Sequence, residues 1–218
     1  MTQPYLDAQN QTLINLLGIQ DADELRTAEY AITDGRLESL TTGHYIPHTQ
    51  KFNFERLREI HRFLFKDIYP WAGKIRALPY RKPLEGDLVG VFVDPAEILP
   101  GWRRLEKRIA DFTAQDKMPF PERVKTLADI MIEANHLHPF PEGNGRSLQI
   151  FMQQLAQRCG VRLDYGRVQP QKWNFASAVS AVYGHYWQDA DGTAFIDKLE
   201  PDREPMRVIF RTMASEID

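Results

Sequence analysis

The nine residues from His138 to Arg146, HPFPEGNGR, bring together a base, an acid, an amide, a guanidinium and two glycines. Apolar residues recur at helical spacing on both sides, which predicts a tight loop between the end of one helix and the start of the next. The first N–H groups of a helix lack intrahelical partners and lie at the positive end of its dipole, so an anion is favoured there. The stretch therefore indicates phosphate-transfer chemistry.

Each polar side chain of this stretch has a natural part in such chemistry. His138 has an ordinary pKa near neutrality, which suits a group that takes the proton from an attacking hydroxyl. Glu142 would repel a phosphate directly, but it suits a Mg²⁺ ion that bridges it to phosphate oxygens. Arg146 can clamp a phosphate oxygen with two parallel hydrogen bonds.

The backbone of the same stretch suits the approach of a phosphate. Gly143 and Gly145 permit positive φ and close contact with a ligand. The second helix is expected to begin between Asn144 and Ser147. We therefore predict that Gly143, Asn144, Gly145 and Arg146 form the anion-binding part of the site.

These residues also have simpler, structural interpretations. His138 alone fits a half-buried residue at a helix end, and the two glycines alone fit an ordinary turn. Glu133, His136 and His138 resemble part of a zinc site, but no third histidine or cysteine lies near them. His61, on an apolar helix, is expected in the core. The combination of residue types and spacing favours the catalytic interpretation.

Helical periodicity dominates the rest of the chain. One helix is predicted from Asn53, as N-cap, to a stop at Pro70, and others are predicted after Pro100–Gly101 and from about Pro121. The helix after the motif should end at Cys159, with Gly160 in the left-handed position. Shorter helices are expected at residues 21–30 and 173–183 and after Pro201.

Residues 77–94, ALPYRKPLEGDLVGVFVD, depart from this pattern. Their apolar residues are β-branched or aromatic, and Glu85-Gly86-Asp87 is a turn signal. These features predict one β-hairpin or flap in an otherwise all-α domain.

The composition limits the class of protein. The chain has 218 residues, of which 43% are hydrophobic, enough for a core. Lys and Arg number 27 against 30 Asp and Glu, a net charge of −3, so no basic surface for nucleic acid is expected. The single cysteine, Cys159, suits a reducing compartment, and the sequence has no apolar run of membrane-spanning length. We expect a cytoplasmic protein that contacts neither nucleic acid nor membrane.

The motif resembles the signature of the Fic (filamentation induced by cAMP) family, His-x-Phe-x-[Asp/Glu]-Gly-Asn-Gly-Arg-x-x-Arg. FNFERLREIHRFLFKDIYPWAGKIR, at residues 52–76, resembles the family's upstream helix and its Tyr-x-Trp-Ala-Gly segment. PYLDAQNQTLINLLGIQDADEL near the start and CGVRLDYGRV after the motif resemble bacterial Fic toxins that are paired with antitoxins. The resemblance covers nearly the whole chain and implies one Fic domain over residues 1–218, with its core at about 45–190.

The resemblance implies an all-α Fic-fold helical bundle with a β-hairpin flap over the active-site loop, and transfer of AMP from ATP to a hydroxyl of a target protein. His138 would be the base, and Glu142 would hold Mg²⁺ against the α- and β-phosphates. Gly143, Asn144 and Gly145 would cradle the phosphates, with the Asn144 side chain on the α-phosphate and Arg146 on the β-phosphate.

Three further parts are implied by the same resemblance. Phe140 would anchor the loop in the core, and Tyr183 would contact the adenine. Residues 91–94 of the flap would align the target's backbone by strand addition. In the toxin group the familiar targets are the type II topoisomerase subunits of DNA gyrase and topoisomerase IV, and a small antitoxin restrains the toxin with an inhibitory helix.

One motif position departs from the family pattern. Gln149 stands where the family has a second arginine, which contacts the γ-phosphate and pairs with the glutamate of the inhibitory helix. The loss of one charge-assisted hydrogen bond corresponds to about 1.5–3 kcal/mol. The chain also lacks the family's inhibitory pattern [Ser/Thr]-x-x-x-Glu-[Gly/Asn], so inhibition in trans is expected. Gln149 leaves two alternatives open: a Fic transferase with another donor (another NMP or phosphocholine), or a weakened Fic module that only binds.

Overall fold

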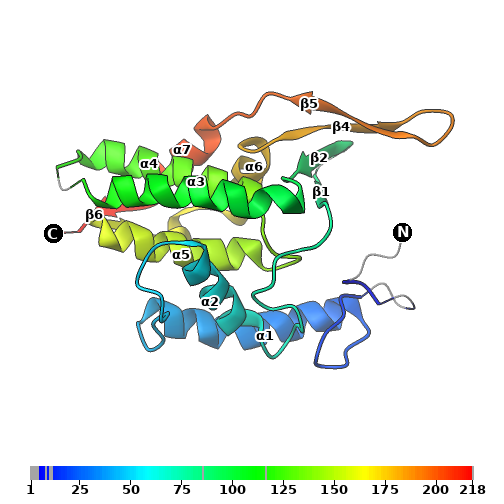
Figure 1. The fold of residues 1–218 in the computed structure, drawn as a ribbon, viewed down its shortest axis with the longest axis horizontal. Coiled ribbons are helices and arrows are strands. Elements are labelled where there is room, and N and C mark those ends of the chain that lie inside the picture. The colour runs from blue at the N-terminus through cyan, green and yellow to red at the C-terminus, as the bar shows by residue number, and fades with distance from the viewer. Residues whose placement is uncertain (1–4, 8, 10–11, 85, 116, 218) are drawn as a thin grey trace. The chain divides into compact units, whose positions relative to one another are not determined.

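The computed structural model describes residues 5–7, 9, 12–84, 86–115 and 117–217 (Figure 1). Its helices are α1 (Ala22–Thr41), α2 (Phe54–Phe65), α3 (Pro95–Thr113), α4 (Phe120–Leu137), α5 (Asn144–Arg158), the 3-10 helix η1 (Tyr165–Arg167), α6 (Pro170–Val179) and α7 (Glu204–Met213). Its strands are β1 (Arg81–Pro83), β2 (Leu88–Val91), β3 (Val161–Leu163), β4 (Tyr183–Gln188), β5 (Ala194–Leu199) and β6 (Ala214–Glu216). The predicted helical fold with a hairpin is confirmed. None of the described helices has the length and apolar character that a bilayer crossing requires.

The chain forms two compact units. The first comprises Met1–Arg76 and Phe140–Phe151, and the second comprises Ala77–Pro139 and Met152–Asp218. The division falls inside the motif, between Pro139 and Phe140, so the two parts of the motif are described below with the units that hold them.

In the first unit, α2 supplies much of the core. Its N-cap is Asn53, as predicted, because the Asn53 side chain accepts a hydrogen bond from the Arg56 N–H. Leu57, Ile60 and Leu64 are fully buried along one face. The helix ends at Phe65 rather than near Pro70, because the Ile68 and Tyr69 N–H groups both turn back to the Phe65 carbonyl.

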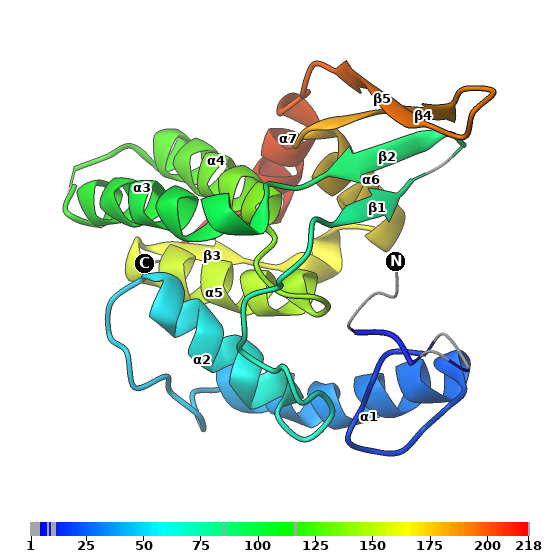
Figure 2. The ribbon, with the colours of Figure 1, turned by 45° about the vertical axis from the view of Figure 1, so that its right-hand side comes forward.

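The second unit has α4 between two other helices, α3 and α7, which explains why apolar residues cover more than one of its faces. Figure 2 shows α3 and α4 side by side. α3 begins at Pro95 with Asp94 as N-cap, not after Pro100–Gly101 as predicted. Pro100 lies inside this helix, where it removes one backbone donor, and Ile98 and Trp102 on either side of it are fully buried.

A four-stranded antiparallel sheet of order β1-β2-β4-β5 also belongs to the second unit (Figure 2). The predicted hairpin is confirmed as β1 and β2; Glu85 of the predicted turn lies outside the described residues. The predicted C-terminal end of the helix at 173–183 is wrong, because α6 stops at Val179 and Tyr183 starts β4. Gly184 explains the close pairing of β4 with β5, since a Cβ there would lie 2.3 Å from the Asp197 carbonyl oxygen.

Other helix ends follow from local residues. α5 begins at Asn144, as predicted, and Gly160 beyond its end has a φ of +70°. α1 is longer than the predicted residues 21–30. It continues to Thr41, beyond the apolar pattern on which the prediction rested. The predicted helix after Pro201 is α7, which begins at Glu204.

Candidate active site

The loop before α5 is held by the Asn144 side chain, in the first unit. Its Oδ1 accepts from the Phe140 N–H at 2.9 Å and its Nδ2 donates to the Phe140 carbonyl at 2.7 Å. Phe140 is fully buried, as the anchoring role predicted. The Asn144 amide thus uses its oxygen and one of its two N–H donors inside the loop, so its second Nδ2–H and its backbone N–H remain to be offered to an anion.

Glycine occurs at the two positions of the loop for different physical reasons. Gly143 has a φ of +79°, and a Cβ there would lie 2.4 Å from Cε2 of Phe65, so no other residue fits. Gly145 is exposed, and no described atom lies within 4 Å of a Cβ built on it. Open space therefore faces the backbone of Gly145 at the start of α5, where amide groups lack intrahelical carbonyl partners.

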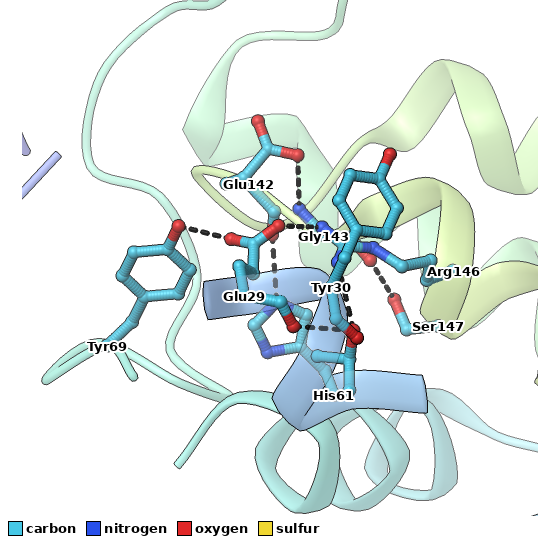
Figure 3. A network of polar contacts seen from close by, with 9 residues as sticks. Glu29, Tyr30, His61, Tyr69, Glu142, Gly143, Arg146 and Ser147 are labelled. Atoms are coloured by element: carbon cyan, nitrogen blue, oxygen red, sulfur yellow. Dashed lines mark hydrogen bonds and ion pairs between the residues drawn. The ribbon is translucent and has the colours of Figure 1, made fainter. Parts of the chain in front are cut away.

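Glu142 is half-buried and lies two residues before the first residue of α5. Its Oε1 accepts a hydrogen bond from the Gly143 N–H at 2.8 Å, which fixes the carboxylate beside the loop (Figure 3). No cluster of three or more His, Cys, Asp or Glu side chains occurs in the described part of the chain. A lone carboxylate fits Mg²⁺ that arrives with phosphates, since this ion keeps most of its ligands from water and substrate.

The buried His61 ring holds the motif loop through a hydrogen bond to its backbone. Its Nδ1 accepts from the Gly73 N–H at 2.9 Å, so Nε2 carries the proton and donates to the Glu142 carbonyl at 2.9 Å. Burial lowers the pKa of His61 to about 3. His61 is a core residue, as predicted, and it also positions the carbonyl of the residue assigned to Mg²⁺.

The depressed pKa of His61 predicts a pH-dependent stability. Below the ordinary histidine pKa of about 6.5 the unfolded chain takes up a proton that folded His61 does not, so its contribution is complete above that pH and is lost as the pH falls toward 3. Between pH 7 and pH 5 the loss is about 2 kcal/mol. Denaturant unfolding of wild type and His61→Gln at both pH values should show a smaller loss in the variant; equal losses would contradict this account.

Arg146 is engaged inside the first unit (Figure 3). Its guanidinium forms an ion pair with Glu29 and donates to Oγ1 of Thr33 at 3.2 Å. Its Cζ lies 5.1 Å from the ring centroid of Tyr30 and 4.8 Å from that of Phe65. Contact with a phosphate would therefore require the guanidinium to exchange or share these partners.

Glu29 connects Arg146 to Tyr69 in this network. Its side chain is 7% exposed, and it also accepts a hydrogen bond from the Tyr69 hydroxyl. Burial and the neighbouring Glu29 raise the pKa of Tyr69 well above its ordinary value. A buried carboxylate is thus satisfied by one guanidinium and one phenol.

Sequence reasoning did not single out Glu29 or Thr33, and Tyr69 was noted only as part of the Tyr-x-Trp-Ala-Gly segment. A signal existed in the four-residue spacing of Leu25, Glu29 and Thr33, all buried on one face of α1. Because two of the three are polar, a search for apolar periodicity passes over them.

His138 belongs to the second unit and is the C-cap of α4, as predicted from its position beyond the helix. Its φ of 40° and ψ of 62° are left-handed, which few residues other than glycine adopt, and such strain is common at functional sites. Its imidazole stacks on Phe92, with ring centroids 3.8 Å apart, and on Tyr80 at 5.2 Å. The hairpin segments thus fix the plane of the candidate base.

A pocket of about 480 Å³ in the second unit includes His138 in its lining. Its wall is mainly apolar, with polar groups contributed by Lys82, Asn135, Gln171, Asn174 and Tyr183. Such a volume and lining are typical of small-ligand sites. The pocket therefore brings Tyr183, the predicted adenine contact, to the same cavity as the candidate base.

The predicted docking of a target backbone along residues 91–94 needs correction. β2 already has β1 on one side and β4 on the other. The Val91 N–H donates to Val182, that of Phe92 to Tyr80 and that of Val93 to His136. Asp94 caps α3. These donors are used inside the unit, so strand addition there would have to displace existing pairs.

The residues considered for zinc are used otherwise. Glu133 forms an ion pair with Arg108, and His136 has a hydrogen bond with the Val91 backbone. Burial lowers the pKa of His136. The His138 ring stacks on Phe92 and on Tyr80, so each of the three side chains has other partners in this structure.

The sequence profile of the Fic/DOC family matches residues 51–156. The protein adenylyltransferase VbhT of Bartonella schoenbuchensis is 32% identical over 84% of this chain, which spans 36% of that relative's length. A probable protein adenylyltransferase Fic of Escherichia coli K12 is 31% identical over 82% of this chain, which spans 84% of that relative.

Solved structures share the fold. The BepC effector protein of Bartonella tribocorum, crystallised with bound AMPPNP, superposes with a TM-score of 0.80 at 22% identity, over 100% of this chain and 99% of that one. The N-terminal Fic domain of a Bartonella quintana effector with bound ADP gives 0.78 at 22% identity, over 98% and 95% of the two chains.

Proposed function

Because this chain belongs to the Fic/DOC family, we propose that it is a nucleotidyltransferase that moves AMP from ATP to a hydroxyl side chain of a target protein. The observation that carries the proposal is His138, a left-handed helix cap whose imidazole lines a cavity of nucleoside size. Relatives named protein adenylyltransferases support it.

The proposed reaction transfers AMP from ATP to the target hydroxyl and releases pyrophosphate. His138 takes the proton of the target hydroxyl, and the hydroxyl oxygen forms a bond to the α-phosphorus. The bond from that phosphorus to the bridging oxygen of the β-phosphate breaks, and pyrophosphate leaves. The pocket around His138 and Tyr183 accepts the nucleoside.

The phosphates are assigned to the motif loop. The backbone N–H groups of Asn144 and Gly145 hold the anion at the start of α5, where Gly145 leaves open space. Glu142 would hold Mg²⁺, which when bound neutralises phosphate charge. Arg146 keeps the start of α5 tied to Glu29 and reaches a phosphate only by sharing that partner.

Radiolabelled ATP tests the proposal. Wild-type protein, Mg²⁺ and a bacterial lysate are incubated with ATP labelled on either the α- or the γ-phosphate. Label on protein from the α-position alone supports AMP transfer. Label from the γ-position would indicate a phosphotransferase, and the absence of label from both would reject transfer from ATP to proteins of that lysate.

Gln149 favours a second candidate, a Fic module that binds nucleotide without efficient transfer. Gln149→Arg restores the charge that the family places on the γ-phosphate, so ATP should bind about 10-fold more tightly or better. Calorimetric titration of both proteins with an ATP analogue measures this, with Gln154→Arg, on the same helix, as the charge-matched control. Equal tightening in both variants would show a general charge effect.

The resemblance to antitoxin-paired toxins favours a cytoplasmic enzyme that acts on subunits of DNA gyrase or topoisomerase IV and is restrained by a small antitoxin. Addition of purified subunits to the labelling reaction tests the targets. The glutamate of such an antitoxin would meet Gln149 instead of arginine, so inhibition should rely on its other contacts.

A further inference from the structure

The second unit contains another pocket, of about 600 Å³, which we call the arginine pocket. It is lined by one face of α3, the last turns of α4, residues 180–182, Pro201 and Arg203. Its charged lining residues are Arg104, Arg108, Arg203 and Glu133. His138 does not line it, and Arg104, Arg108 and Arg203 do not line the cavity assigned to the nucleoside.

The charges of the arginine pocket are unbalanced. Three guanidinium groups face one carboxylate, and that carboxylate, of Glu133, is paired with Arg108. The side chains of Arg104 and Arg203 form no ion pair with any residue in the described ranges. Arg104 lies one turn from Arg108 on α3, and Glu133 compensates only the charge of Arg108.

The remaining lining is apolar, with one histidine. Leu105, Ile132 and Leu137 are buried side chains that contribute to the pocket wall. Nδ1 of His136 is buried and has no hydrogen-bond partner among the described residues. With its other nitrogen bound to the Val91 backbone, neutral His136 offers a lone pair to a hydroxyl of a ligand.

We propose that the arginine pocket binds a small organic phosphate. Its phosphate would bind Arg104 and Arg203, and its apolar body would cover Leu105 and Leu137. A phosphate monoester carries about −1.5 to −2 charges at neutral pH, which matches the excess of two positive charges, and guanidinium groups bind phosphate oxygens in pairs. The volume is typical of small-molecule sites.

The arginine pocket is lined by the last turn of α4, which directly precedes His138, the candidate base. Leu137 directly precedes His138, and the carbonyl of His136 accepts the Val93 N–H. Gly101 lets the Leu137 side chain approach α3, since a Cβ at that position would lie 2.3 Å from Cδ2 of Leu137. An anion in the arginine pocket therefore contacts the last turn of α4 without entering the nucleoside cavity.

The test is a calorimetric titration with phenyl phosphate at constant ionic strength, with inorganic phosphate and phenol as partial probes. Arg104→Gln and Arg203→Gln should each weaken phenyl phosphate binding by about 10-fold or more, because each removes a charge-assisted hydrogen bond. Arg103→Gln changes the same charge on an exposed neighbour outside the pocket and should leave binding unchanged. Both partial probes should bind more weakly than phenyl phosphate.

Three results would overturn the proposal. Equal weakening in all three variants would indicate a general charge effect, and no weakening in Arg104→Gln and Arg203→Gln would put the anion elsewhere. Failure of phenyl phosphate to bind at millimolar concentration would reject the site. Thermal unfolding of each variant ensures that folded proteins are compared. The titrations measure phenyl phosphate binding alone, so they can be interpreted whether or not the protein transfers AMP.

Discussion

Arg146→Ala is expected to lower the free energy of unfolding by about 3–5 kcal/mol, because it leaves Glu29 as a buried carboxylate without its cation. It also removes a guanidinium that contacts the rings of Tyr30 and Phe65. Urea unfolding of the nucleotide-free protein, followed by tryptophan fluorescence, measures the loss. If Glu29 is the reason, the double variant Glu29→Gln with Arg146→Ala should lose less than the two single losses added together.

Arg36→Ala is a matched control for this prediction. Arg36 also comes from the first unit and pairs with Asp67, but the Asp67 side chain is 60% exposed. An exposed pair of this kind is worth about 0–1 kcal/mol. Arg36 also donates a hydrogen bond to the Leu64 carbonyl, whose loss adds about 1 kcal/mol, so Arg36→Ala should still lose less than Arg146→Ala. Similar losses for Arg146→Ala and Arg36→Ala would mean that the Glu29 network does not hold the start of α5, and would leave Arg146 free for the phosphate role that the family resemblance implies.

His138→Ala should reduce the rate of AMP transfer by about 10²–10⁴-fold, the usual contribution of a positioned general base. The fold should survive, since His138 caps α4 with its backbone and its ring is only half-buried. Initial rates with α-labelled ATP at saturating nucleotide measure the effect, and calorimetry with an ATP analogue should show retained binding.

The control for the base is His44→Ala, which removes an exposed histidine whose ring contacts Thr42. Its rate should equal that of wild type. A His138→Ala rate within a few-fold of that of His44→Ala would remove His138 from the proton transfer and point to another base.

Much of the helical framework was predictable because its signals are local. The Asn53 cap and the glycines at 143 and 160 mark helix boundaries through conformations that depend on a few residues. The placement of His138 at the end of α4 followed from the same reasoning.

What the sequence could not predict depends on distant partners. Tyr183 starts a strand rather than ending a helix, because β4 pairs with β2 and β5. Glu29 and Arg146 meet across 117 positions, and neither residue type indicates a buried pair by itself. The two hydrogen bonds between the Asn144 amide and the Phe140 backbone are also a property of the folded loop, and they orient the side chain that is predicted to contact a phosphate.

Mass spectrometry of the modified target shows whether His138 supports transfer of an adenylyl group to a protein hydroxyl. Lysate supplemented with purified gyrase and topoisomerase IV subunits is incubated with ATP, Mg²⁺ and either wild type or His138→Ala, and the digested proteins are searched for modified side chains. We expect peptides that carry one adenylyl group on a Ser, Thr or Tyr hydroxyl with wild type and far fewer with His138→Ala. Adenylylated peptides at equal levels in both samples, or phosphorylated peptides in their place, would contradict this expectation.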